Sequence, residues 1–247
     1  MRFKYLADMT KHILPAMENY TILTAGNAMP EKILPTPAAQ KFYDRIGKRY
    51  DWFEFYEGRA KEQAMHALQL EPGLKILSVG AGTGKELAQI QAGISPGGTA
   101  IGLDLSTEMC RVAKQRVGAT ICQADARQMP FSSNTYHRLY AGYMLDLLPF
   151  EDLHQLLGDF WNTLLPNGKL VVLALTEGVD RPSKALVSIW KSIFDLSPAI
   201  CGGCRPLELL ELVQETGFRD IQRRVIVQAG VPSELISAHK NQESVWL

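Results

Sequence analysis

Residues 76 to 84 read Ile-Leu-Ser-Val-Gly-Ala-Gly-Thr-Gly, a strand-forming run that ends in three glycines at alternate positions, Gly80, Gly82 and Gly84. Glycine has no Cβ, so such a segment turns sharply out of a strand and brings backbone N–H groups close to a ligand. The stretch therefore predicts a strand, a ligand-binding loop and the start of a helix. A tight strand-to-helix turn that binds nothing remains an alternative.

The spacing of the glycines indicates which ligand the loop favours. A dinucleotide-binding loop has the pattern G-x-G-x-x-G, but Lys85 stands at its third glycine position here. A Walker loop needs Ser or Thr after that lysine, and the residue present is Glu86, whose negative charge would lie where a phosphate binds. The loop therefore favours a nucleotide ligand without phosphates.

An acidic residue follows where a nucleoside ligand requires one. Residues 85 to 92 predict a helix, residues 95 to 98 a turn, and residues 99 to 103 a second strand that ends at Asp104. Asp104 comes about 20 residues after the last glycine, the spacing at which an acid after the second strand binds ribose hydroxyl groups. Helix capping by Asp104 and Ser106 is the alternative interpretation.

Three stretches stand at corresponding points of successive strand ends: Val79-Gly80-Ala81-Gly82-Thr83-Gly84, Gly102-Leu103-Asp104-Leu105-Ser106 and Ala124-Asp125-Ala126. Through them the chain resembles the class I S-adenosylmethionine-dependent methyltransferases, and within that class the ubiquinone and menaquinone biosynthesis branch. The resemblance runs from about residue 41 to residue 239. It implies an enzyme whose cofactor is S-adenosylmethionine and whose product is S-adenosylhomocysteine.

The resemblance also implies roles for individual residues. The glycine loop would face the methionine part of the cofactor, Asp104 the ribose, and Asp125 with the backbone amide of Ala126 the adenine edge. The cofactor-binding set implied in this way is Tyr50, Gly80, Ala81, Gly82, Thr83, Gly84, Asp104, Leu105, Met109, Asp125, Ala126 and Tyr143. Leu105 and Met109 would flank the adenine ring, since apolar side chains suit its faces.

The segment before the first strand is expected to complete the site. Residues 41 to 51 resemble a helix of the quinone branch in which a Tyr-Asp pair closes over the cofactor, so Tyr50 would bind the methionine carboxylate. An ordinary tyrosine of an amphipathic helix is the alternative. We expect an extension over residues 1 to 35 and a methyltransferase domain over residues 36 to 247. The apolar residues of the extension suit a lid over a hydrophobic acceptor, packing on the outside, or self-association.

The rest of the chain predicts strands and helices in alternation. Strands are expected at 119–122, 137–141 and 169–174, and helices at 106–117, 150–164, 181–194 and 206–216. Residues 218 to 228 and 234 to 239 alternate enough to pair as an antiparallel edge. The predicted fold is α/β: a doubly wound, mostly parallel Rossmann-like sheet with an antiparallel edge strand and an N-terminal helical lid.

Catalytic residues are harder to predict, because methyl transfer from a sulfonium mainly requires alignment and exclusion of water. Tyr143 follows the fourth strand and is a candidate for orienting a substrate, while Asp146 and Glu177 are weak candidates for accepting a proton. For the two acids we favour the interpretation as solvated carboxylates. His137 begins its strand and is expected at the opposite end of the sheet from the site.

Composition limits the partners. With 26 basic and 26 acidic residues in 247, no basic stripe favours nucleic acid, so a small-molecule acceptor is expected and oligomeric state is left open. No stretch is long enough to cross a membrane, which leaves peripheral membrane contact open and makes the cytoplasm the default location. The pair Cys201 and Cys204 lacks the further ligands of a zinc site, so no metal is expected.

The chain also departs from the quinone branch. After the fourth strand it has Tyr143-Met144-Leu145-Asp146-Leu147 instead of the Arg-Asn of that branch, which leaves a phospholipid amine or a secondary-metabolite hydroxyl as alternative acceptors. Two other functions remain as alternatives. They are a cofactor-binding assembly module without catalysis and a nicotinamide oxidoreductase.

Overall fold

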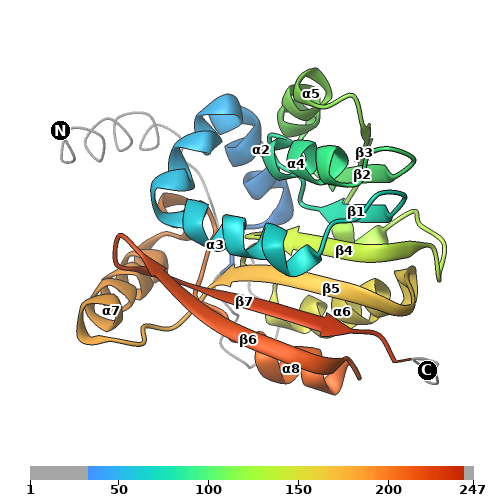
Figure 1. Ribbon diagram of the computed structural model, residues 1–247. Coiled ribbons are helices and arrows are strands. Elements are labelled where there is room, and N and C mark those ends of the chain that lie inside the picture. Colours follow the sequence, from blue (N-terminus) through green and yellow to red (C-terminus); the bar gives the residue numbers. More distant parts are fainter. Residues whose placement is uncertain (1–32, 242–247) are drawn as a thin grey trace.

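A computed structural model describes residues 33 to 241, which form one seven-stranded sheet between two layers of helices (Figure 1). The strand order is β3-β2-β1-β4-β5-β7-β6. The first five strands are parallel, β7 runs antiparallel to β5, and β6 runs antiparallel to β7. The order reverses between β1 and β4, and open α/β sheets bind ligands at such a point.

The bounds of the elements agree closely with the hydrophobic pattern of the sequence. The strands are β1 Lys75–Val79, β2 Thr99–Asp104, β3 Thr120–Gln123, β4 Tyr136–Gly142, β5 Leu164–Leu175, β6 Arg219–Gln228 and β7 Val231–His239. The α-helices are α2 Thr36–Ile46, α3 Glu54–Leu68, α4 Lys85–Gly93, α5 Thr107–Arg116, α6 Phe150–Thr163, α7 Arg181–Leu196 and α8 Leu210–Glu215. Short 3₁₀ segments are η2 Gly47–Phe53, η3 Ala126–Gln128, η4 Leu145–Leu147 and η5 Pro198–Cys201.

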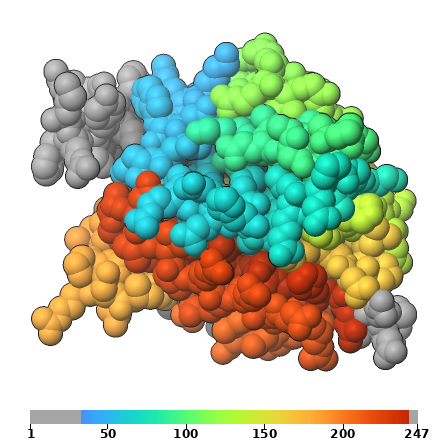
Figure 2. All heavy atoms as spheres, viewed as in Figure 1, coloured from blue at the N-terminus to red at the C-terminus, as the bar shows by residue number. Residues whose placement is uncertain are grey.

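Two apolar cores lie on the two faces of the sheet. One contains the inner faces of α3, α4 and α5, and the other contains those of α6 and α8. The α6 stripe from Leu153 to Trp161 is buried, as its helical spacing predicts. Figure 2 shows α3 and α4 as a continuous layer over one face, with β6 and β7 beside them.

The predicted fold class is therefore confirmed, with local differences. The antiparallel part is a hairpin whose second strand, β7, lies inside the sheet between β5 and β6, and β7 begins three residues earlier than the alternation indicates. Helix α8 begins at Leu210 instead of residue 206, and the N–H of Leu207 donates to the carbonyl of Leu175 at the end of β5. The predicted lid over residues 1 to 35 lies almost entirely outside the described residues.

The two ends of the parallel strands have different surroundings. At the amino end of β4, His137 Nδ1 accepts a hydrogen bond of 3.0 Å from the backbone N–H of Lys75. His137 is thus at the end of the sheet opposite the glycine loop, as predicted. The carboxyl ends of β1, β2 and β4 lie beneath α2 and η2, and the candidate site is found there.

Candidate functional site

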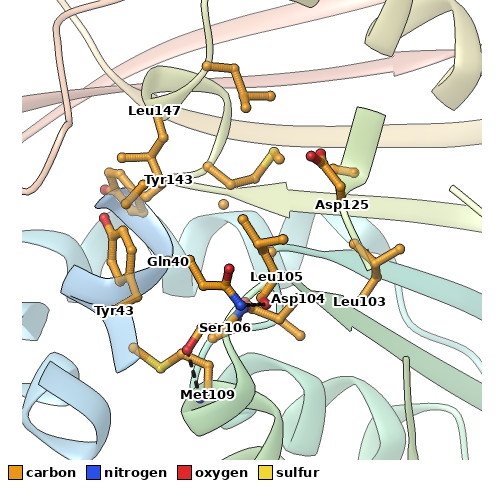
Figure 3. A pocket seen from close by; sticks show the side chains of 18 of the residues that line it. Gln40, Tyr43, Leu103, Asp104, Leu105, Ser106, Met109, Asp125, Tyr143 and Leu147 are labelled. Carbon is orange, nitrogen blue, oxygen red and sulfur yellow. Dashed lines mark hydrogen bonds between the residues drawn. The ribbon is translucent and has the colours of Figure 1, made fainter. Parts of the chain in front are cut away.

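A cavity lies over the carboxyl ends of β1, β2 and β4 (Figure 3). Its empty volume, including the open mouth, is about 1140 Å³, enough for a cofactor-sized ligand. Of the residues predicted to bind the cofactor, eleven line it: Tyr50, Gly80, Ala81, Gly82, Thr83, Asp104, Leu105, Met109, Asp125, Ala126 and Tyr143. The structure thus brings together residues that are spread over more than 90 positions of the sequence.

The three glycines of the loop have three different surroundings. All have positive φ values, between 53° and 77°, a region that side chains disfavour. A Cβ on Gly82 would meet open space, whereas one on Gly80 would lie 2.7 Å from Met144 Cβ. A Cβ on Gly84 would lie 2.9 Å from Ala113 Cβ on α5. Gly84 is absent from the cavity lining, and its lack of a side chain allows close packing against α5; its contact with the cofactor stays a prediction.

Asp104 is held rigidly at the end of β2. Its Oδ2 accepts the N–H of Gly82 at 2.7 Å and its Oδ1 accepts the N–H of Ser106 at 2.9 Å. Burial raises the pKa of the Asp104 carboxyl, and these two backbone hydrogen bonds oppose that rise. The cap of α5 is Ser106, whose Oγ accepts the Met109 N–H. Helix capping therefore explains Ser106 and leaves Asp104 at the cavity wall.

Asp125, Ala126, Leu105 and Met109 also line the cavity. Both of its carboxylate oxygens accept from the Arg127 guanidinium, at 2.6 to 3.2 Å. These bonds hold the pKa of Asp125 below its usual range, so the group is a carboxylate at neutral pH. Each carboxylate oxygen has two lone pairs, which leaves acceptor capacity for a ligand amino group.

The predicted tyrosines form part of an aromatic wall. The Tyr50 ring comes from η2, and the Tyr143 ring follows β4 with a φ of 53°. The Tyr143 hydroxyl hydrogen-bonds to Ser233 Oγ of β7 at 2.7 Å, which fixes its ring. Burial raises the pKa of both hydroxyls well above the usual value, so both stay neutral at physiological pH.

The two acidic candidates for catalysis lie outside the cavity lining. Asp146 is 1% exposed, its Oδ2 accepts the Leu175 N–H at 3.2 Å, and burial raises its pKa to about 7. The interpretation of Asp146 as a solvated carboxylate is therefore wrong. Glu177 carries a partly exposed side chain that forms an ion pair with Lys191, in agreement with the solvated interpretation. Of the three candidates, only Tyr143 lines the cavity.

Several lining residues are missed by the sequence analysis. Gln40 and Tyr43 come from α2, Lys61 from α3, Glu86 from the first turn of α4, and Tyr140 from β4. The Tyr140 hydroxyl is buried and has no hydrogen-bond partner within residues 33 to 241. Only Glu86 gave a signal in the sequence, because its charge already argued against phosphate. The others are placed by packing that a local pattern does not encode.

Polar contacts fasten the segment from α2 to α3 across the site. Asp51 accepts the Thr83 hydroxyl at 2.6 Å and forms an ion pair with Arg116 at 2.6 Å. Asp44 accepts from the Ser106 hydroxyl at 2.6 Å and from the Glu108 N–H at 3.1 Å. The helix expected to close over the cofactor does lie over the cavity, and two of its acids bind the loops that carry predicted site residues.

The wall beyond Tyr43 is mostly apolar. It contains Ile33, Leu34, Leu147, Leu148 and Pro149. Within residues 33 to 241 no group of three or more His, Cys, Asp or Glu side chains is arranged to bind a metal ion. Cys201 and Cys204 are free thiols. In the same part of the chain, no helix combines the length and the hydrophobicity needed to cross a membrane.

The geometry suits a nucleoside that carries an amino-acid tail. Asp104 and Tyr140 both line the cavity, and a Cβ on Gly82, whose N–H donates to Asp104, would meet open space. Apolar side chains at the Asp125 end suit an aromatic base. These features are typical of doubly wound proteins that bind a phosphate-free nucleoside at the ends of the first two strands.

Comparisons with known proteins relate the chain to methyltransferases. Residues 76 to 168 match the family of methyltransferase domains. Demethylmenaquinone methyltransferase of Bacillus cereus is 26% identical over an alignment of 146 residues that covers 55% of this chain and 61% of the relative. The chain thus spans 61% of the length of the curated relatives that it matches first.

Solved methyltransferases share the fold. An S-adenosylmethionine-dependent methyltransferase of Thermotoga maritima has a TM-score of 0.63 at 16% identity, covering 82% of this chain and all of the other. Phosphoethanolamine N-methyltransferase 2 of Haemonchus contortus has a TM-score of 0.62 at 17% identity, covering 83% of this chain and 60% of the other. Together these matches support the prediction that the chain is a class I S-adenosylmethionine-dependent methyltransferase.

Proposed function

We propose that this chain transfers a methyl group from S-adenosylmethionine to a small acceptor with a substantial apolar part. The observation that carries the proposal is a single cavity that joins the predicted cofactor residues to the apolar wall of Ile33, Leu34, Leu147, Leu148 and Pro149. A quinone-like compound, a lipid or a secondary metabolite would fit such a wall. A cofactor-binding module without catalysis would not need such an apolar wall.

In this proposal the protein contributes mainly by positioning the cofactor and the acceptor. S-adenosylmethionine supplies a methyl group on a positively charged sulfur. Asp104 and Asp125 would hold the nucleoside, and the segment from α2 to η2, fastened at Asp44 and Asp51, would exclude water. Burial keeps the hydroxyls of Tyr50 and Tyr140 neutral, so these groups suit donation of hydrogen bonds to an acceptor.

Two measurements test the proposal. Titration calorimetry with S-adenosylmethionine, S-adenosylhomocysteine and NAD(P) should show binding of the first two ligands and no binding of the third. Tight binding of NAD(P) without either of the others would instead support an oxidoreductase. A screen of quinones, phenols, amines and lipid extracts with methyl-labelled cofactor should then give a labelled product with the wild-type protein. The Asp104→Ala variant should not form that product.

A further inference from the structure

Two oppositely charged side chains lie next to each other in the cavity wall. Lys61 Nζ is 3.2 Å from Glu86 Oε1 and 2.9 Å from Glu57 Oε2. The side chains of Lys61 and Glu86 are only 11% and 14% exposed, and both line the cavity, whereas Glu57 stands behind Lys61 and does not. The three groups come from α3 and α4, on either side of the glycine loop.

This cluster costs free energy, which argues that it has a use. Taking charges out of water is expensive, and well-packed apolar residues often stabilise a protein more than a buried ion pair does. Burial lowers the pKa of Lys61, but Glu86 and Glu57 outweigh that effect, so the pKa is raised and Lys61 stays charged. The protein therefore keeps a fixed positive and a fixed negative group at one wall of its ligand cavity.

The position of the pair matches one part of the expected ligand. Lys61 Nζ lies 5.3 Å from the ring centre of Tyr50 and 5.9 Å from that of Tyr143. Glu86 is in the first turn of α4, directly after the glycine loop. This is the methionine end of the site, and Asp104 lies between it and the adenine end at Asp125. An amino-acid tail carries an ammonium and a carboxylate on the same carbon, so two adjacent charges of opposite sign complement it.

We propose that Lys61 and Glu86 bind the amino-acid end of the cofactor, with Lys61 donating to the carboxylate and Glu86 accepting from the ammonium. A lysine ammonium has three N–H donors, so Lys61 can donate to a ligand carboxylate while it stays ion-paired with Glu57 and Glu86. Glu57, which does not line the cavity, positions Lys61 through their ion pair. The inference rests on the proposed function, since it assumes that S-adenosylmethionine occupies the cavity.

A pair of ligands isolates this contact. S-adenosylhomocysteine and methylthioadenosine share the nucleoside and the thioether, but only the first carries an amino-acid tail. In calorimetry, Lys61→Met and Glu86→Gln should each weaken S-adenosylhomocysteine binding by about 10- to 100-fold, the range for a hydrogen bond between charged groups. Methylthioadenosine affinity should stay within about twofold. Asp104→Ala, by contrast, should weaken both ligands.

Controls keep the test decisive. Lys85→Met removes a neighbouring lysine that pairs with Glu54 outside the cavity, and it should leave both affinities unchanged. If Lys61→Met fails to fold because Glu57 is left buried and unpaired, the double variant Glu57→Gln/Lys61→Met removes both charges and should show the same selective loss.

Two results would overturn the inference while leaving the proposed function intact. They are an equal loss for both ligands, or unchanged S-adenosylhomocysteine affinity in the charge-removing variants of Lys61 and Glu86. Failure of the wild-type protein to bind S-adenosylhomocysteine at all would instead reject the proposed function, and the inference with it.

Discussion

Replacing Asp104 by Asn would separate the binding role of this residue from its structural role. The two carboxylate oxygens of Asp104 accept two different backbone donors, the N–H of Gly82 in the glycine loop and the N–H of Ser106 at the start of α5. An asparagine has the same shape but only one oxygen. Its NH₂ group must therefore face one of these two N–H donors and leave it without an acceptor.

The magnitudes follow from this geometry. A buried N–H that loses its partner costs about 1–3 kcal/mol, so the free energy of unfolding should fall by that amount. Hydrogen bonds to an ionised acceptor are roughly twice as strong as neutral ones. Weaker bonds to the ribose hydroxyls, together with a less fixed Gly82, should reduce S-adenosylhomocysteine affinity by about 10- to 100-fold.

The assays are urea unfolding for stability and calorimetry with S-adenosylhomocysteine and methylthioadenosine for affinity. Asp220→Asn is a matched control, because Asp220 is exposed on the β6 edge and has a φ of 53°, which asparagine tolerates. A loss of stability with unchanged affinity would mean that Asp104 only stabilises the fold, and it would refute the ribose assignment. Unchanged stability would refute the argument from the two N–H donors.

Three further substitutions test other parts of the structure. Gly80→Ala places a Cβ 2.7 Å from Met144 Cβ at a φ of 68°, so urea unfolding should show a loss of about 1–3 kcal/mol; an unchanged midpoint would contradict the close approach. Asp51→Ala removes the bond to the Thr83 hydroxyl and should weaken S-adenosylhomocysteine about tenfold, whereas full affinity in calorimetry would mean that this contact does not hold the site closed. Burial raises the pKa of Asp146 to about 7, above its ordinary value near 4, so the unfolded chain ionises first and wild-type stability should fall as the pH rises from about 4 to about 7. Asp146→Asn should flatten this dependence in unfolding experiments across that range, and identical slopes in the two proteins would rule out such a titration.

The parts of the fold that the sequence predicts well are those with local patterns. The strand that ends at Gly80, the helix from residue 150 with its apolar stripe, and the strand that ends at Asp104 all agree with the structure within a few residues. The place of β7 inside the sheet was not predictable in the same way. It depends on pairing between residues far apart in the chain, such as Val172 with Ile236, and single-strand alternation does not encode the partner.

The same distinction applies to the site. Residues in motifs at strand ends, such as Asp104 and Asp125, reach the cavity because parallel strands place their carboxyl ends at one edge. Lys61 belongs to no motif, since its place depends on how α3 packs against α4. Gly84 shows the converse. It stands inside the motif, but the space it leaves is taken up by Ala113 of α5 and not by the cavity.

The contacts of α2 and η2 connect this packing to ligand binding. Asp44 bonds to the start of α5, and Asp51 bonds to Thr83 in the glycine loop. Both acids therefore depend on loops whose other groups are proposed to hold the cofactor. Coupling between two such equilibria is reciprocal, so any ligand that orders the loops must also tighten the segment over them. A substitution that loosens that segment should therefore weaken the ligand, even though neither Asp44 nor Asp51 lines the cavity.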